Sequence, residues 1–320
     1  MNILHFCPKA KQIRFFRTIK AELNANFSDQ PEFLFNYWNV GEFLRTLRER
    51  TSQLDAIIIS AHGWEDAILK PIQGTFTRTI TMEDAPLFTN KFVFANSCYT
   101  ARKFGPELVK NGAFTFIGFN DSIGEAFSSN NQYKEIVEKI FKRIYTTSLA
   151  NSFTAFVKKC LTTSEFCEYI DFQFRKSLNT VMKMKISDIN SSFQVSIEES
   201  NKDIIKLVKL EFIEKFDDLK NKIVLVGEKN YIYWHNIKNL SVEDLKDRLE
   251  KIEGISENNN LYKYFIKLLI YLCLDDQISF LNVIEQFYIE LKKMDGNIKI
   301  FNTPFELQKE FEKMKEIYAG

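Results

Sequence analysis

The chain has 320 residues, of which 45% are hydrophobic and 27% are charged, and its formal net charge is +1. This composition is that of a globular protein and excludes a disordered or fibrous one. The near-neutral charge gives no overall field that favours nucleic acid, and no apolar run reaches the ~20 residues that a transmembrane helix needs.

The first half alternates between strand-like and helix-like segments. Apolar strand patterns occupy residues 2–7, 32–39, 55–63, 91–98 and 113–119, and helical spacing of apolar residues separates most of them. Helices between apolar strands predict a parallel sheet that is covered on both faces. Ligands of such sheets bind outside the carboxyl ends of the strands, so the residues that follow each strand are the candidates for a site.

The middle and the end of the chain are organised differently. The alternating stretch 67–82 predicts a β-hairpin beside the sheet, and a long amphipathic helix begins at Tyr133. A second hairpin is expected over 221–234, and the stripe over 303–318 predicts a last helix. Because the pattern changes near residue 185, we expect a first domain over 1–185 and a mainly helical α+β accessory or recognition region over 186–320.

Two strand ends carry side chains that suit chemistry. The run AIIIS leads into His62 and Gly63, and the run FVFAN leads through Ser97 into Cys98. A thiol between a strand and a helix is a candidate nucleophile, because free N–H groups there favour the thiolate. A histidine can protonate a leaving amine, and a glycine after it can offer its N–H to an oxyanion. Taken singly, such a histidine is usually a satisfied polar residue and such a cysteine a small buried hydrophobe.

The segments AIIISAHG and FVFANSCYTA resemble the caspase-like cysteine peptidases, in which one strand ends in His-Gly and the next core strand ends in a small residue and Cys. A closer resemblance is to the CHAT subgroup of bacterial caspase-like domains. The later segments NGAFTFIGFND and EKIFKRIYTTSLANSFTAFVKKC extend it over about residues 1–180. It implies a caspase-like three-layer α/β sandwich with a mostly parallel sheet, followed by the mainly helical C-terminal region.

The resemblance also implies roles for individual residues. Cys98 would be the nucleophile and His62 the general acid and base of a dyad, and the N–H groups of Gly63 and Cys98 would form the oxyanion hole. Asn96 and Asp121 match positions that line the specificity pocket. A carboxylate there suggests cleavage after Lys or Arg; alternatively, Asp121 caps the turn NDSIG. No metal and no cofactor are expected.

The function implied is that of a cysteine endopeptidase that cleaves a partner protein, as an effector in bacterial antiviral defence or cell death. Region 186–320 would then bind an activator or sensor protein, without direct contact to nucleic acid or membrane. The alternative is a protein-binding module that has kept the fold and lost the chemistry, since Ser97 stands where relatives more often have Ala or Gly. An α/β-hydrolase or nucleotide-binding protein is disfavoured, because neither a G-x-S-x-G elbow nor a phosphate loop occurs.

The cysteines bear on location and on metals. There are five, an odd number without a tight framework, which predicts reduced thiols and a cytoplasmic protein. Cys160 and Cys167 are spaced by seven on an expected helix without a second pair of ligands, which argues against a zinc site. His5 and His235 are expected to be structural.

Overall fold

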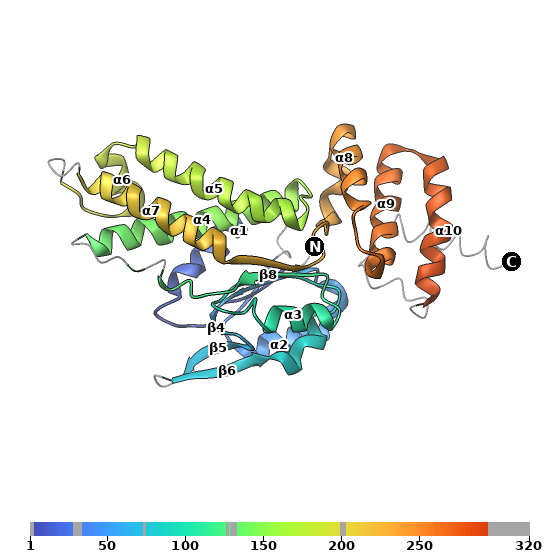
Figure 1. Ribbon diagram of the computed structural model, residues 1–320, viewed down its shortest axis with the longest axis horizontal. Coiled ribbons are helices and arrows are strands. Elements are labelled where there is room, and N and C mark those ends of the chain that lie inside the picture. The colour runs from blue at the N-terminus through green and yellow to red at the C-terminus, as the bar shows by residue number, and fades with distance from the viewer. Residues whose placement is uncertain are drawn as a thin grey trace.

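The computed structural model describes residues 3–27, 34–72, 75–125, 128, 133–198 and 203–293. Their centre is a six-stranded sheet (Figure 1), in which the strands follow the order β2-β1-β3-β7-β8-β9. The strands are β1 (Ile3–Phe6), β2 (Leu34–Tyr37), β3 (Ala56–Ser60), β7 (Phe92–Asn96), β8 (Thr115–Phe119) and β9 (Ile223–Gly227). Neighbouring strands are parallel, except that β9 runs antiparallel to β8. The predicted mixed α/β class with a mostly parallel sheet is confirmed.

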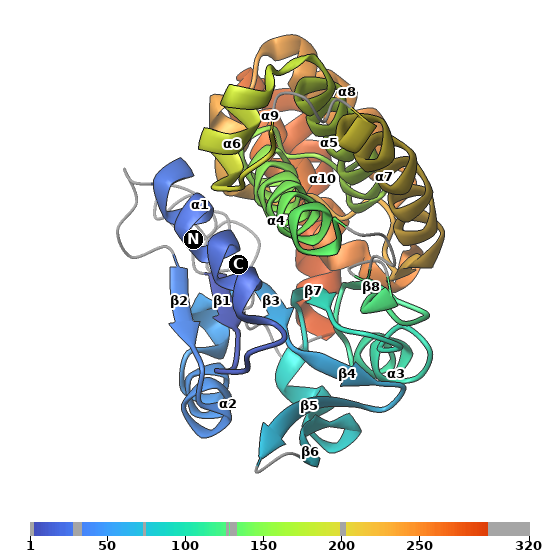
Figure 2. The same cartoon turned by 90° about the vertical axis from the view of Figure 1, so that its left-hand side faces the viewer.

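Helices cover both faces of this sheet (Figure 2). On one face lie α1 (Arg17–Asn26), α4 (Lys134–Lys158) and α5 (Thr163–Lys183), and on the other α2 (Val40–Glu49), the 3-10 helix η3 (Met82–Phe88) and α3 (Phe104–Lys110). Every residue of β3, β7 and β8 is buried, because the alternate side chains of each strand enter opposite cores. Phe94, for example, packs towards α4 and Ala95 towards α2 and α3.

A small antiparallel sheet stands beside the large one. It consists of β4 (His62–Trp64), β5 (Ala67–Ile72) and β6 (Thr75–Thr81), in that order. The hairpin predicted over 67–82 and the long helix predicted from Tyr133 are both confirmed. Because β4 begins directly after Ala61, the chain leaves the large sheet at the residue that precedes His62.

The hairpin predicted over 221–234 is wrong. Only its first arm is a strand, and that arm pairs with β8 at the free edge of the large sheet. After Gly227, whose φ is +94°, the chain turns, and Tyr231 and Tyr233 become buried rather than forming a second arm. Since β9 completes the sheet from beyond residue 185, the boundary expected there does not separate the sheet from the rest of the chain.

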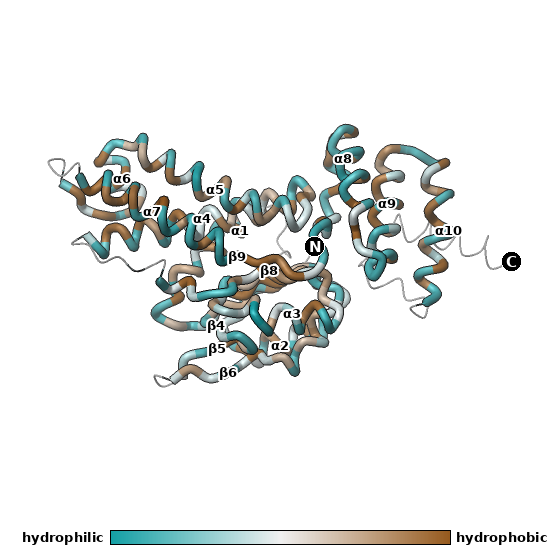
Figure 3. The backbone as a smooth tube through the Cα atoms, viewed as in Figure 1, coloured by the Kyte–Doolittle hydropathy of each residue, from teal (hydrophilic) through white to brown (hydrophobic). Residues whose placement is uncertain are grey.

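The remaining elements are helical. They comprise the 3-10 helices η1 (Arg14–Phe16), η2 (Thr51–Gln53), η5 (Trp234–Asn239) and η6 (Glu257–Asn259), and the α-helices α6 (Ile186–Phe193), α7 (Asp203–Lys222), α8 (Val242–Ile252), α9 (Asn260–Leu274) and α10 (Gln277–Lys293). Figure 3 shows apolar sheet strands and helices that alternate between apolar and polar residues. The helix predicted over 303–318 lies outside the described residues. Within the described ranges, no helix has the length and apolar character to cross a membrane.

Candidate active site

The sheet delivers the two candidate catalytic residues to the same edge. β3 and β7 are parallel neighbours in which Ser60 lies opposite Asn96. His62 follows Ser60 by two residues and Cys98 follows Asn96 by two, so both emerge at the carboxyl ends of adjoining strands. Cys98 packs against the core on the α4 face, whereas His62, the first residue of β4, packs against β6 of the small sheet.

Gly63 brings the two strand ends into direct contact. A Cβ atom at this position would lie 2.5 Å from the backbone oxygen of Cys98 and 2.8 Å from both Ser97 Cβ and Thr100 Cγ2. Only glycine fits such an approach. The backbone next to His62 therefore lies against the turn that carries Cys98.

The turn at Cys98 is held by the segment after β8. Tyr99 has a φ of +61°, and its N–H donates to the backbone oxygen of Asp121 at 3.3 Å. The sulfur of Cys98 accepts a hydrogen bond from the N–H of Ile123 at 3.4 Å. The N–H of Cys98 itself makes no hydrogen bond to any described residue, and so it is free to bind an oxyanion.

His62 is half-buried at the start of β4. Its ring packs against Phe76 of β6, with 4.7 Å between the ring centroids. Burial lowers its pKa, so the imidazole is neutral at pH 7. Its Nε2 atom is buried and has no hydrogen-bond partner in the described part of the chain. No hydrogen bond joins His62 to Cys98, a bond that catalytic pairs often form only once substrate is present.

A chain of buried polar side chains runs beneath this edge. Tyr145 donates to Asn96 at 3.2 Å, Asn96 donates to Ser60 at 3.4 Å, Ser60 hydrogen-bonds to His5 at 3.1 Å, and His5 hydrogen-bonds to Asn36 at 3.1 Å. Burial raises the pKa of Tyr145 well above its usual value, and the nearby thiol of residue 98 adds to the shift. The hydroxyl of Tyr145 therefore lies close to the candidate nucleophile.

These hydrogen bonds give Asn96 a different role from the one expected. Its side chain is fully buried, so it lies below the site and does not line a substrate pocket. Sequence reasoning missed Ser60 and Tyr145 as its partners. The available signal was a polar residue at the end of each of two otherwise apolar strands.

Asp121 lies at the surface beside the Cys98 turn. Its carboxylate accepts the N–H of Ser122 at 2.8 Å, which is the turn-capping contact considered above. The guanidinium of Arg102 lies 3.8 Å away, stacks on Tyr99 at 4.7 Å from the ring centroid, and donates to Glu65 at 2.9 Å. A cation of the protein itself therefore already lies beside the Asp121 carboxylate.

Among the described residues, neither the other cysteines nor any group of side chains that could bind a metal forms a competing active site. Burial raises the pKa of Cys160 and that of Cys167 to about 12 each, and raises that of Cys7 to about 11. Among the residues that the structure describes, no group of three or more His, Cys, Asp or Glu side chains is arranged to hold a metal ion. His235 contacts Asp55 at 2.8 Å, away from the candidate site.

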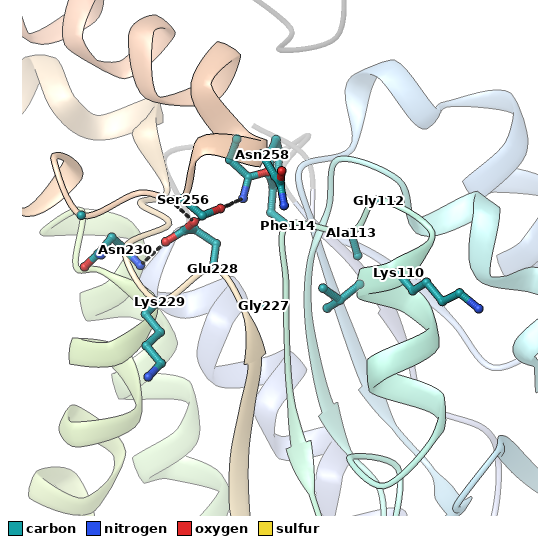
Figure 4. Close-up of a pocket in the computed structure, with 13 residues that line it drawn as sticks. Lys110, Gly112, Ala113, Phe114, Gly227, Glu228, Lys229, Asn230, Ser256 and Asn258 are labelled. Atoms are coloured by element: carbon teal, nitrogen blue, oxygen red, sulfur yellow. Dashed lines mark hydrogen bonds between the residues drawn. The ribbon is translucent and has the colours of Figure 1, made fainter.

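A cavity of about 680 Å³ lies at the opposite edge of the sheet (Figure 4). Its buried carboxylate, Glu228, accepts the N–H groups of Asn230 and Ser256 at 3.0 Å each and the amide of Asn259 at 3.2 Å. These contacts tie the turn after β9 to the segment before α9. Because these hydrogen bonds occupy the Glu228 carboxylate, we interpret it as a structural connection between two segments and not as a reactive group of the cavity.

No model of a known protein family matches the chain, and no curated protein shows significant similarity to it. Any assignment of function therefore depends on the geometry of the His62 and Cys98 strand ends.

Proposed function

We propose that the protein is a cysteine endopeptidase with a caspase-like, CHAT-type sandwich fold and a dyad of Cys98 and His62. The observation that carries the proposal is the contact of Gly63 with the Cys98 turn. This contact fixes the histidine and the thiol on adjoining strand ends, at the edge where α/β sheets build their sites.

The reaction begins with a proton transfer. Because burial lowers the pKa of His62, the neutral imidazole can take the proton of the Cys98 thiol. The thiolate attacks the peptide carbonyl carbon, and the oxyanion accepts the N–H groups of Cys98 and Gly63. The protonated His62 then gives its proton to the leaving amine. Water, deprotonated by His62, hydrolyses the thioester and releases a carboxylic acid and the free thiol.

The proposed substrate is a partner protein that is cleaved after a basic residue. Asp121 supports this specificity because its side chain is 47% exposed and its backbone contacts the Cys98 turn. A substrate cation would take the place of Arg102 beside that carboxylate. We further propose a cytoplasmic effector of bacterial defence or cell death, with region 186–320 binding an activator or sensor protein; all five cysteines are free, which agrees with a reducing compartment.

A protein-binding module without catalysis is the second candidate. Two observations favour it: the imidazole and the thiol are not hydrogen-bonded to each other, and Arg102 already neutralises Asp121. In that case the same edge would hold a peptide without breaking it.

Cleavage of a library of unstructured peptides, followed by mass spectrometry, tests the proposal. We expect cuts after Lys or Arg by the wild-type protein and by Cys273→Ala, which removes an exposed thiol elsewhere. Cys98→Ala and His62→Ala should cut nothing. Cutting by Cys98→Ala at the same bonds would contradict the mechanism, and peptide binding without cutting by the wild-type protein would support the module.

A further inference from the structure

A second pocket opens on the same edge of the sheet as the candidate active site. It lies at the carboxyl ends of β1 and β2, on the far side of β3 from β7, and has a volume of about 140 Å³. Its walls include His5 and Cys7 of the β1 end, Trp38 of the β2 end, and the cations Lys9, Arg17 and Lys20.

Within the described part of the chain, the positive charges of this pocket have no acidic partner. Lys9, Arg17 and Lys20 make no ion pair with any described residue, and no acidic side chain lines the pocket. Two of these cations, Arg17 and Lys20, shift the pKa values of residues that line the pocket. Burial raises the pKa of the Cys7 thiol, and Arg17 opposes this shift. Burial lowers the pKa of His5; a hydrogen bond that the His5 ring donates to the Asn36 side-chain oxygen opposes this, and Lys20 lowers the pKa further.

The placement of these cations favours the binding of an anion. Arg17 and Lys20 lie in the first turn of α1, and neither η1 nor the start of α1 has an acidic residue there. Cations are unfavourable at the positive end of a helix dipole, and like charges around one small cavity repel each other. A bound anion would relieve both effects.

The size and the rim of the pocket indicate the kind of anion. A volume of about 140 Å³ is below that of pockets for whole drug-sized ligands, which start at roughly 300 Å³, and suits a single tetrahedral group. Three cations match the double charge of a phosphate better than the single charge of a carboxylate. At the rim, Trp38 is 53% exposed with the ammonium of Lys9 at 4.4 Å from its ring centroid, and it offers a flat face to the rest of a ligand.

We propose that this pocket binds the phosphate group of a small phosphorylated ligand. Arg17 and Lys20 hold the phosphate, and Trp38 contacts the part of the ligand outside the pocket. The His5 ring at the floor hydrogen-bonds to Ser60, which leads to the buried side chains beneath Cys98. A ligand here would lie at one end of that hydrogen-bonded chain. The proposal does not depend on peptidase activity.

Isothermal titration calorimetry at low salt, with inorganic phosphate and ribose 5-phosphate as probes, tests this site. Both should bind to the wild-type protein and to Lys11→Ala, which removes an exposed cation that does not line the pocket. Arg17→Ala and Lys20→Met should each weaken binding about tenfold or more. Circular dichroism establishes that the variants are folded.

The His5 ring gives a second readout. A bound phosphate would favour the protonated imidazole, so the pH midpoint of the His5 resonances in NMR spectra should rise when phosphate is added. The proposal is overturned if neither probe binds at tens of millimolar, if acetate binds as tightly as phosphate, or if Lys11→Ala weakens binding as much as Arg17→Ala.

Discussion

Replacing Gly63 by alanine tests the contact that joins the two strand ends. The added methyl would lie 2.5 Å from the backbone oxygen of Cys98 and 2.8 Å from Ser97 Cβ and Thr100 Cγ2. The nearest of these atoms belongs to the backbone, so no side-chain rotation relieves the clash. Either the β4 strand or the Cys98 turn must move.

The expected cost follows from forced overpacking of a close contact, which destabilises proteins by about 1–3 kcal/mol. Gly124→Ala is a matched control, because its nearest neighbour is Ser122 Oγ at 3.5 Å, an ordinary van der Waals distance. Both substitutions restrict the unfolded chain to the same extent, so the difference between the two variants isolates the native-state clash. A displacement of about 1 Å at the turn would also reduce any cleavage by about 100-fold.

Urea unfolding followed by circular dichroism measures the free energies. We expect Gly63→Ala to fall about 1–3 kcal/mol below Gly124→Ala, and Gly124→Ala to stay within about 0.5 kcal/mol of the wild-type protein. If Gly63→Ala is as stable as the control and cleaves peptides at the same rate, the strand ends do not touch as described.

Three further changes test other parts of the structure. Burial holds the pKa of His5 at about 4 in the folded protein, so the unfolded chain takes up this proton first as the pH falls from ~6.5 towards 4. The free energy of unfolding should therefore drop by about 3 kcal/mol in that pH range. If the free energy of unfolding of His5→Gln depends on pH in the same way as that of the wild-type protein, this reasoning is wrong. Glu228→Ala leaves three hydrogen-bond donors without their acceptor and should lower the free energy of unfolding in urea by about 3 kcal/mol. The control Lys229→Ala, at an exposed position, should lower it by under about 0.5 kcal/mol. Equal costs would show that Glu228 does not tie the turn after β9 to the segment before α9. Phe92→Ala removes a fully buried ring that packs between α4 and Tyr231 and should lower the free energy of unfolding by about 3–5 kcal/mol. Phe172 is 52% exposed, so Phe172→Ala should lower it by under about 1 kcal/mol. Similar thermal midpoints for the two variants would contradict the described packing of Phe92.

The strands of the large sheet were predictable where burial on both faces leaves a continuous apolar run, as in β3, β7 and β8. The strand β9 was also predictable, as one arm of a hairpin, but its pairing with β8 was not, because β8 lies more than a hundred residues away in the sequence. Residues 223–227 could pair equally well with the next apolar run or with a distant edge. The free edge of β8 decides the outcome, and local pattern carries no information about that edge.

The candidate site divides in the same way. His62 and Cys98 could be singled out because each follows an apolar strand and the carboxyl ends of parallel strands share one edge. The burial of Asn96 could not be predicted, because Tyr145, which covers it, comes 49 positions later in the sequence, on α4. The pairing of Asp121 with Arg102 likewise arises only when the segment after β8 meets the Cys98 turn.

The proposed peptidase function requires that His62 and Cys98 act as a pair at one edge of the sheet. Its most direct test is the rate at which a peptide probe with a C-terminal arginyl electrophile modifies each thiol, followed by mass spectrometry. We expect modification of Cys98 and not of the exposed Cys273, at a rate that His62→Ala lowers by about 100-fold or more. Equal rates for the wild-type protein and His62→Ala, or modification of Cys273 alone, would contradict it.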